Sequence, residues 1–346
     1  MKLTLATTKW PKPLLGQNSN RQWIYFLLLA IFYIGWITFM TVSQQWVLFQ
    51  DYWQATLTMV LGSFVAGITA EGGGAVAFPV FTKVLHIAAT DARTFSLMIQ
   101  SFGMGMASIF IVTRGIRVLP RVILYVSLGG ILGHLLGLFW FPLPAPYPKI
   151  LFTFVTTAFG VALIISRWGL QWTPRMDLSD WNHKHRLIFL FLGVLGGVFA
   201  ANVGSGIDVV TFMVLTLMFG INEKISTPTT VIIMGLNSIV GFIFHGAVAQ
   251  DISPDIWRYW LVAVPVVVVG APFGAFVGSK ISRDAVIVFL LTLISIELIT
   301  TLLLVPFTAV TWFVTALVTL FFGLSFAAML YYRHNHIPQM SADSPG

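Results

Sequence analysis

The chain of 346 residues is 57% apolar and 9% charged, with no cysteine and a net charge of +7. Soluble domains carry about 25% charged residues, so this composition excludes a soluble enzyme, a nucleic-acid-binding protein and a disordered scaffold. Without cysteine, disulfides, thiolate metal sites and cysteine nucleophiles are excluded as well. The sequence therefore predicts a polytopic membrane protein without a large domain outside the bilayer.

The apolar stretches predict membrane helices along nearly the whole chain. The first apolar block, 24–49, is too long for a signal peptide and is predicted to be a retained first span. All later stretches are predicted to be helices, because they lack the alternating polarity of a membrane β-barrel. They cover residues 55–89, 94–113, 118–141, 148–166, 187–221, 227–246, 256–281, 284–305 and 309–332.

The apolar pattern repeats along the chain. When the sequence is shifted by 131 positions, Glu71 aligns with Asn202, and a slip of one residue aligns the run 72–74 (GGG) with 204–206 (GSG). Each repeat thus begins with a long segment broken by glycine and continues with three ordinary spans. The predicted parts are 1–54 (cytoplasmic N-terminus and first span), 55–166 (first repeat), 167–186 (cytoplasmic linker), 187–305 (second repeat) and 306–346 (last span and cytoplasmic tail).

The two glycine-broken segments are about 35 residues long, whereas one crossing takes about 20. Each is therefore predicted to be a re-entrant hairpin of two half-helices that enters and leaves on one face. Only this arrangement makes the basic residues at 114–121, 167–186 and 280–283 cytoplasmic, with Lys149 as an exception. The first hairpin then enters from outside and the second from the cytoplasm, so the repeats are inverted copies, as in secondary transporters.

The predicted fold is thus an all-α membrane protein with eight full spans, two re-entrant hairpins and both termini in the cytoplasm. The predicted location is the inner (plasma) membrane. Lipid is therefore the expected surrounding of the chain, and nucleic acid is not an expected partner. The oligomeric state is left open, because uniformly apolar spans do not reveal a contact surface.

The two hairpin tips are the predicted substrate site. A glycine-rich turn at membrane depth offers amide N–H groups, and the half-helix that follows points its positive dipole end at the turn. Two tips that meet near the midplane would form a cradle for an anion. The alternative is that glycine only allows close helix packing, which is the interpretation adopted for Gly129, Gly133 and Gly137 and for Gly270, Gly274 and Gly278. The tip residues are Gly72, Gly73, Gly74 and Ala75 in the first repeat and Asn202, Gly204, Ser205 and Gly206 in the second.

A polar stripe follows each hairpin. Helical spacing places several of its side chains on one face, where they could bind an oxyanion from the side. The alternative, that the hydroxyl groups bond back to their own helix, stays open. The candidates are Thr94, Ser96 and Gln100 in the first repeat and Thr227 and Asn237 in the second.

Three carboxylates lie at membrane depth, where ionisable groups are costly and usually functional. An anion beside Glu71 requires this carboxyl to be protonated, so Glu71 is a candidate proton-coupling group; the alternative is that it caps the helix after the turn. Asp208 is a second proton-coupling candidate, with stabilisation of its helix dipole as the alternative. Glu297 is predicted to make a contact between helices.

The remaining polar residues in apolar segments are assigned structural roles. Lys83 is expected to snorkel to the outer surface rather than to draw anions inward. His134 and His245 are expected to pack as single histidines. No metal site and no cofactor are expected.

The segments GITAEGGGAVAFPVF (67–81) and GGVFAANVGSGIDVVTF (196–212) resemble the glycine motifs of the TauE/SafE family of sulfite and organosulfur exporters. The resemblance extends over about residues 55–305. It implies a transporter of sulfite, a sulfonate or a related sulfur anion, usually moved with protons across the inner membrane of bacteria or archaea. Two positions depart from the family pattern, because Glu71 stands where the family commonly has an apolar residue and Asn202 precedes GSG. The exact anion and the coupling ion are therefore left open.

The predicted function is a secondary transporter that exports a small sulfur-containing anion, with protons as the coupling ion, by alternating access around a midplane site. One alternative is a passive anion channel whose filter is formed by the same tips. Another is a membrane scaffold without transport. An enzyme is not expected, because the sequence contains no HExxH, GxSxG or paired-carboxylate motif.

Overall fold

The computed structural model describes residues 21–70, 72–144, 146–169, 174–178 and 181–336. These residues are nearly all helical, and one isolated β-bridge joins Arg175 to Ile221. Nine of the described helices are long and apolar enough to cross a membrane. The predicted all-α polytopic fold is confirmed.

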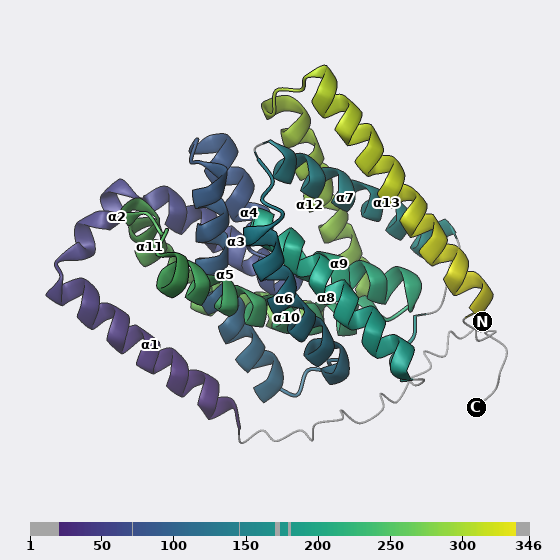
Figure 1. Cartoon of the computed structure of the whole chain (residues 1–346). Helices are drawn as coiled ribbons and strands as arrows, with labels where there is room; N and C mark the ends of the chain where they lie inside the picture. Colours follow the sequence, from purple (N-terminus) through teal and green to yellow (C-terminus); the bar gives the residue numbers. More distant parts are fainter. Residues whose placement is uncertain (1–20, 71, 145, 170–173, 179–180, 337–346) are drawn as a thin grey trace, which may run out of the picture.

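The first and last helices lie at the margins of the bundle. In Figure 1, α1 (Gln22–Val42) and α13 (Ala309–His336) occupy opposite edges of the molecule. Only 11% of the apolar window of each helix is buried by protein. Their apolar side chains therefore face lipid, and the helices between them form the core.

The two halves of the chain contain the same order of elements. In each half a hairpin of one long and one short helix ends in a π-helical turn, and three long helices follow. The first half comprises α3 (Trp53–Ile68), α4 (Gly74–Pro79), η3 (Val80–Val84), α5 (Ala89–Thr113), α6 (Pro120–Phe139) and α7 (Tyr147–Ile164). The second comprises α8 (His183–Val203), α9 (Ile207–Met213), η5 (Val214–Met218), α10 (Glu223–Ile243), α11 (Pro254–Lys280) and α12 (Arg283–Leu304). Shorter pieces are η2 (Gln45–Val47), α2 (Leu48–Asp51), η4 (Ile165–Gly169) and η6 (Phe244–Ala249).

Both glycine-broken segments turn back towards the end of the bundle at which they begin. Tyr52, which precedes α3, and Ile87, which follows η3, line the same cavity of about 400 Å³. In the second segment, Phe189 near the start of α8 stacks on Phe219, which follows η5, with ring centroids 5.4 Å apart. This return is what a re-entrant hairpin requires.

The second hairpin has a longer first arm than predicted. The sequence indicates arms of roughly 15 residues, but α8 has 21 residues and is therefore about 31 Å long. It begins at His183, inside the predicted linker, because Asn182 and His185 form a capping box there. This extension makes α8 the ninth helix that is long enough to span, whereas α3 has 16 residues.

Two rows of glycine allow close packing between the halves. A Cβ added at Gly133 of α6 would collide with the carbonyl of Val194 in α8, and one added at Gly274 of α11 would collide with the carbonyl of Phe64 in α3. Helix α8 thus packs on α6, and α3 packs on α11. The interpretation of these rows as close helix packing is confirmed, since the other members, Gly129, Gly137, Gly270 and Gly278, face the same partner helices.

Candidate functional site

The tips of the two hairpins meet inside the bundle. A Cβ added at Gly72 would lie 2.7 Å from Asp208 Oδ2, 3.0 Å from Ser205 Oγ and 2.6 Å from Gln100 Oε1. Gly72 belongs to the first tip, Ser205 and Asp208 belong to the second, and Gln100 comes from α5. All four residues are buried. The helices that follow the tips, α4 and α9, are labelled near the centre of Figure 1.

The backbone at the second tip requires glycine at two positions. Gly204 has φ +82° and Gly206 has φ +129°, both in the region that favours glycine. A Cβ at Gly204 would lie 2.6 Å from the carbonyl oxygen of Arg93, and one at Gly206 would collide with the ring of Phe199. The sequence GSG therefore places one side chain, that of Ser205, between two backbone positions that exclude a Cβ.

Asp208 stabilises the start of α9 with one carboxylate oxygen. Its Oδ1 accepts hydrogen bonds from the N–H groups of Gly206 and Val209, both at 3.0 Å. Its Oδ2 is buried without a hydrogen-bond partner among the described residues and faces Gly72. The hydrogen bonds to Oδ1 are those expected if Asp208 stabilises the helix dipole. Oδ2 is the oxygen that a proton-binding role of Asp208 would use. The Gly206 amide, counted as part of the predicted cradle, is occupied by this carboxylate.

Gln100 connects α5 to the second tip. Its Nε2 donates hydrogen bonds to the carbonyl oxygens of Gly204 at 2.7 Å and Ser96 at 3.0 Å. Its Oε1 is buried without a partner in the described part of the chain and lies close to Gly72. Gln100 thus holds the second tip in place and presents its acceptor oxygen to the first.

Three other predicted ligands carry buried polar atoms that no described residue satisfies. They are Ser96 Oγ, Thr227 Oγ1 and both side-chain amide atoms of Asn237. A buried polar atom is normally hydrogen-bonded, so each of these atoms marks a place for water or a polar ligand.

Two predicted ligands make structural contacts instead. The Thr94 hydroxyl donates back to the carbonyl of Thr90 at 3.0 Å, which is the alternative left open for the polar stripe. The Asn202 side chain accepts from the Leu143 N–H at 2.7 Å and donates to the carbonyl of Phe141 at 3.1 Å. Asn202 therefore fastens the segment after α6 to the end of α8 and does not join the group around Gly72.

The remaining tip residues are described only in part. Glu71 lies outside the described residues, and of Gly74 and Ala75 only the backbone, which begins α4, is described. Gly73 differs from Gly72, because a Cβ there would have its nearest neighbours at 3.5 Å, an ordinary contact distance. A cavity of about 10 Å³ lies beside Gly73 and Gln100.

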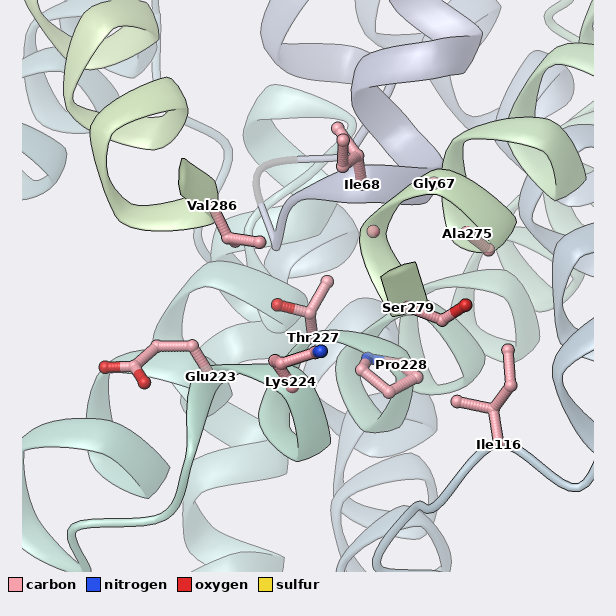
Figure 2. Close-up of a pocket in the computed structure, with 11 residues that line it drawn as sticks. Gly67, Ile68, Ile116, Glu223, Lys224, Thr227, Pro228, Ala275, Ser279 and Val286 are labelled. Atoms are coloured by element: carbon pink, nitrogen blue, oxygen red, sulfur yellow. The ribbon is translucent and has the colours of Figure 1, made fainter. Parts of the chain in front are cut away.

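A second small cavity lies between the start of α10 and the ends of α3 and α11 (Figure 2). Lys224 and Thr227 of α10 and Ser279 of α11 are among its lining residues, and Gly67 and Ile68 of α3 line it on the side of the first tip. Its volume is about 20 Å³, which is room for about one water molecule. Lys224 and the Thr227 hydroxyl, which has no partner among the described residues, therefore line a cavity next to the first hairpin.

Lys83 does not snorkel to the surface, so that prediction is wrong. Its side chain is only 3% exposed, and Nζ donates to Glu297 Oε1 at 3.0 Å and to the hydroxyls of Thr300 and Thr301 at 3.1 and 2.9 Å. Because Glu297 and these hydroxyls satisfy all three ammonium protons, the charge has no need to reach water. The contact between helices predicted for Glu297 is confirmed, and Thr153 of α7 also donates to it. The sequence signal was a single cation and a single carboxylate in otherwise apolar segments.

A bundle of apolar helices with two broken hairpins whose glycine tips meet inside it has the architecture of a transmembrane transporter. The model of the sulfite exporter TauE/SafE family matches residues 55–298, a range that includes both hairpins. The chain therefore belongs to this family, whose members are transporters. No significant match was found among curated proteins or among solved structures.

Proposed function

We propose that this protein exports sulfite, a sulfonate or a related small sulfur-containing anion by alternating access around the two hairpin tips, with protons as the coupling ion. The observation that carries the proposal is the meeting of Gly72 with Ser205 and Asp208 from the opposite hairpin. Broken helices that meet at depth are typical of secondary transporters. The family supplies the class of substrate.

The cavities beside the tips favour a carrier over a passive channel. The two cavities, lined by Gly73 and by Thr227, have volumes of about 10 and 20 Å³. Each has room for about one water molecule, whereas a sulfur oxyanion has several heavy atoms. The helices must therefore move before such an anion can reach the tips, which is the defining step of alternating access.

We also propose that the halves are inverted in the membrane. Asp255, at the start of α11, accepts a hydrogen bond from Tyr52 beside the first hairpin at 3.1 Å. Arg283, just beyond the end of α11, pairs with Glu223, which follows the second hairpin. Because α11 is long enough to span the membrane, these contacts support an arrangement in which the open ends of the hairpins lie at opposite faces. The basic residues favour the Arg283 end as the cytoplasmic one.

Single cysteines in this cysteine-free chain test the orientation. We expect Asp51→Cys and Thr90→Cys, both at exposed positions on either side of the first hairpin, to react with a membrane-impermeant maleimide added to intact cells. Lys184→Cys, exposed at the start of α8, should react only after permeabilisation. If labelling of Thr90→Cys also needed permeabilisation, the first segment would cross the membrane and the inverted arrangement would be wrong.

Sulfite flux in proteoliposomes tests the function. A carrier saturates with sulfite, shows counterflow and responds to an imposed pH gradient, whereas a passive channel shows neither counterflow nor proton coupling. In this assay, Glu71→Gln should lower pH-driven accumulation by at least about tenfold and leave exchange of labelled for unlabelled sulfite intact, because only a titrating carboxyl can carry the proton. Asp255→Asn, a change at an exposed carboxylate, serves as the control. Unchanged pH-driven accumulation in Glu71→Gln would remove Glu71 from the coupling step.

A further inference from the structure

A row of buried polar side chains begins at the end of the bundle that carries Asp255. His245 is 1% exposed, and its Nδ1 lies 2.8 Å from Asp251 Oδ1, whose side chain is 46% exposed. The other ring nitrogen of His245, Nε2, is buried without a partner among the described residues. One imidazole thus has a partly solvated carboxylate on one side and an unsatisfied nitrogen inside the protein.

His134 of α6 continues the row. It is completely buried, and neither of its ring nitrogens has a partner in the part of the chain that the structure describes. Its ring centroid lies 6.5 Å from that of His245. This separation is too large for a direct hydrogen bond, whose heavy atoms lie about 3 Å apart, but it leaves room for a bridging water molecule.

Asn237 of α10 leads from the histidines to the second tip. A Cβ added at Gly130, one turn before His134 on α6, would lie 2.9 Å from Asn237 Oδ1 and 2.5 Å from the side chain of Ile207. Ile207 immediately precedes Asp208, whose Oδ2 is also buried without a partner in the described chain. Unsatisfied polar atoms in such a sequence indicate ordered water along the row.

Charged side chains lie around the two histidines of the row. Asp251 attracts a protonated His245, whereas Arg93 of α5 repels positive charge on both His245 and His134. Asp91 and Asp251 in turn act on Arg93. The attraction for a proton is therefore strongest at the surface end of the row, next to Asp251.

We propose that Asp251, His245 and His134 form a proton path between the outer face and Asp208 at the second hairpin tip. This inference rests on the proposed proton-coupled transport. In the transfer, the Asp251 carboxyl gives its proton to Nδ1 of His245, while Nε2 of the same ring releases its proton to the bridging water. The water passes one proton to His134, and the remaining proton of His245 stays on Nδ1, facing the Asp251 carboxylate. Only O–H and N–H bonds form and break, so the step needs no electron donor or acceptor.

The experiment records proton and sulfite movement separately in proteoliposomes that contain the full chain. A pH-sensitive dye inside the vesicles reports proton entry, and labelled sulfite reports exchange at equal pH. In His134→Asn and His245→Asn, coupled acidification should fall by at least about tenfold while exchange is unchanged, because asparagine is polar but does not titrate. His86→Asn is the matched control, since His86 is an exposed histidine at the same end with φ +55°, which asparagine tolerates.

External imidazole provides a second measurement that does not depend on His134. We expect it to restore acidification in His245→Asn, because the Asp251 side of this position is open to water. Normal coupled acidification in both histidine variants, beside a coupled wild type, would overturn the proton path alone. A wild type that exchanges sulfite without moving protons would overturn the coupling and the path together. A wild type that moves no sulfite would overturn the proposed function itself.

Discussion

Replacing Gly72 with alanine should abolish transport, whereas the same replacement at Gly73 should leave it nearly intact. Gly72 has φ +70°, a conformation that costs a residue with a Cβ about 1–2 kcal/mol. The added carbon would also lie 2.6 Å from Gln100 Oε1 and 2.7 Å from Asp208 Oδ2, so these side chains or the tips themselves would have to shift. At Gly73 the nearest atoms would be 3.5 Å away. Sulfite exchange in proteoliposomes, corrected for the amount of inserted protein, measures the difference.

The two adjacent glycines separate the contact of the tips from a general effect of bulk in a glycine-rich turn. Equal loss of exchange in Gly72→Ala and Gly73→Ala would mean that the turn tolerates no side chain at all. Full activity in Gly72→Ala would mean that the tips do not need to touch, and the proposed substrate site would have to be abandoned.

Removing the charge of Lys83 should lower the free energy of unfolding by about 3–5 kcal/mol, the usual cost of leaving one partner of a buried ion pair alone. In Lys83→Met, Glu297 keeps the hydroxyl bonds from Thr153 and Thr301 at 3.0 and 3.1 Å but loses its cation. Because Lys83 follows α4 and Glu297 lies on α12, the pair fastens the first hairpin to the second half of the chain. Thermal unfolding in detergent measures the loss.

A second substitution and an exposed ion pair provide the controls. Lys83→Met combined with Glu297→Gln should recover much of the stability, since no buried charge is then left without a partner. Arg258→Met removes an exposed partner of Asp255 and should not change the unfolding temperature measurably. A double variant no more stable than Lys83→Met would show that the two residues do not stabilise each other.

The architecture could be predicted because its signals are local. Apolar stretches indicate spans, and a glycine-rich break in an overlong stretch indicates a turn at depth. The repetition of that break identified Gly72 and Ser205 as parts of one candidate site, and the structure brings them together, with Asp208 beside them. The extra length of α8 arises from the Asn182 cap inside a polar segment, where hydropathy gives no boundary.

The partners of single polar residues could not be predicted. A lone Lys83 or His134 in an apolar segment gives no indication of which distant helix carries its neighbour. Snorkelling was therefore the natural expectation for Lys83, and it is wrong because a tertiary contact supplies Glu297. His134 is completely buried, as its expected packing role requires, with the ring of His245 as a neighbour. Asn202 shows the reverse case, since its position beside a tip suggested a ligand but its amide holds the segment after α6.

The exchange of helices between the halves limits how this chain can be divided. Because α3 packs on α11 and α8 packs on α6, the long arm of each hairpin is buried mainly by the other half of the chain. A fragment ending after α7 would expose to lipid the face of α3 that meets Gly270 and Gly274 in the intact molecule. Two fragments cut at the linker would have to associate in the bilayer before either long arm could be buried. In the proposed inverted arrangement, a protein made of one half alone would need a second copy inserted in the opposite orientation.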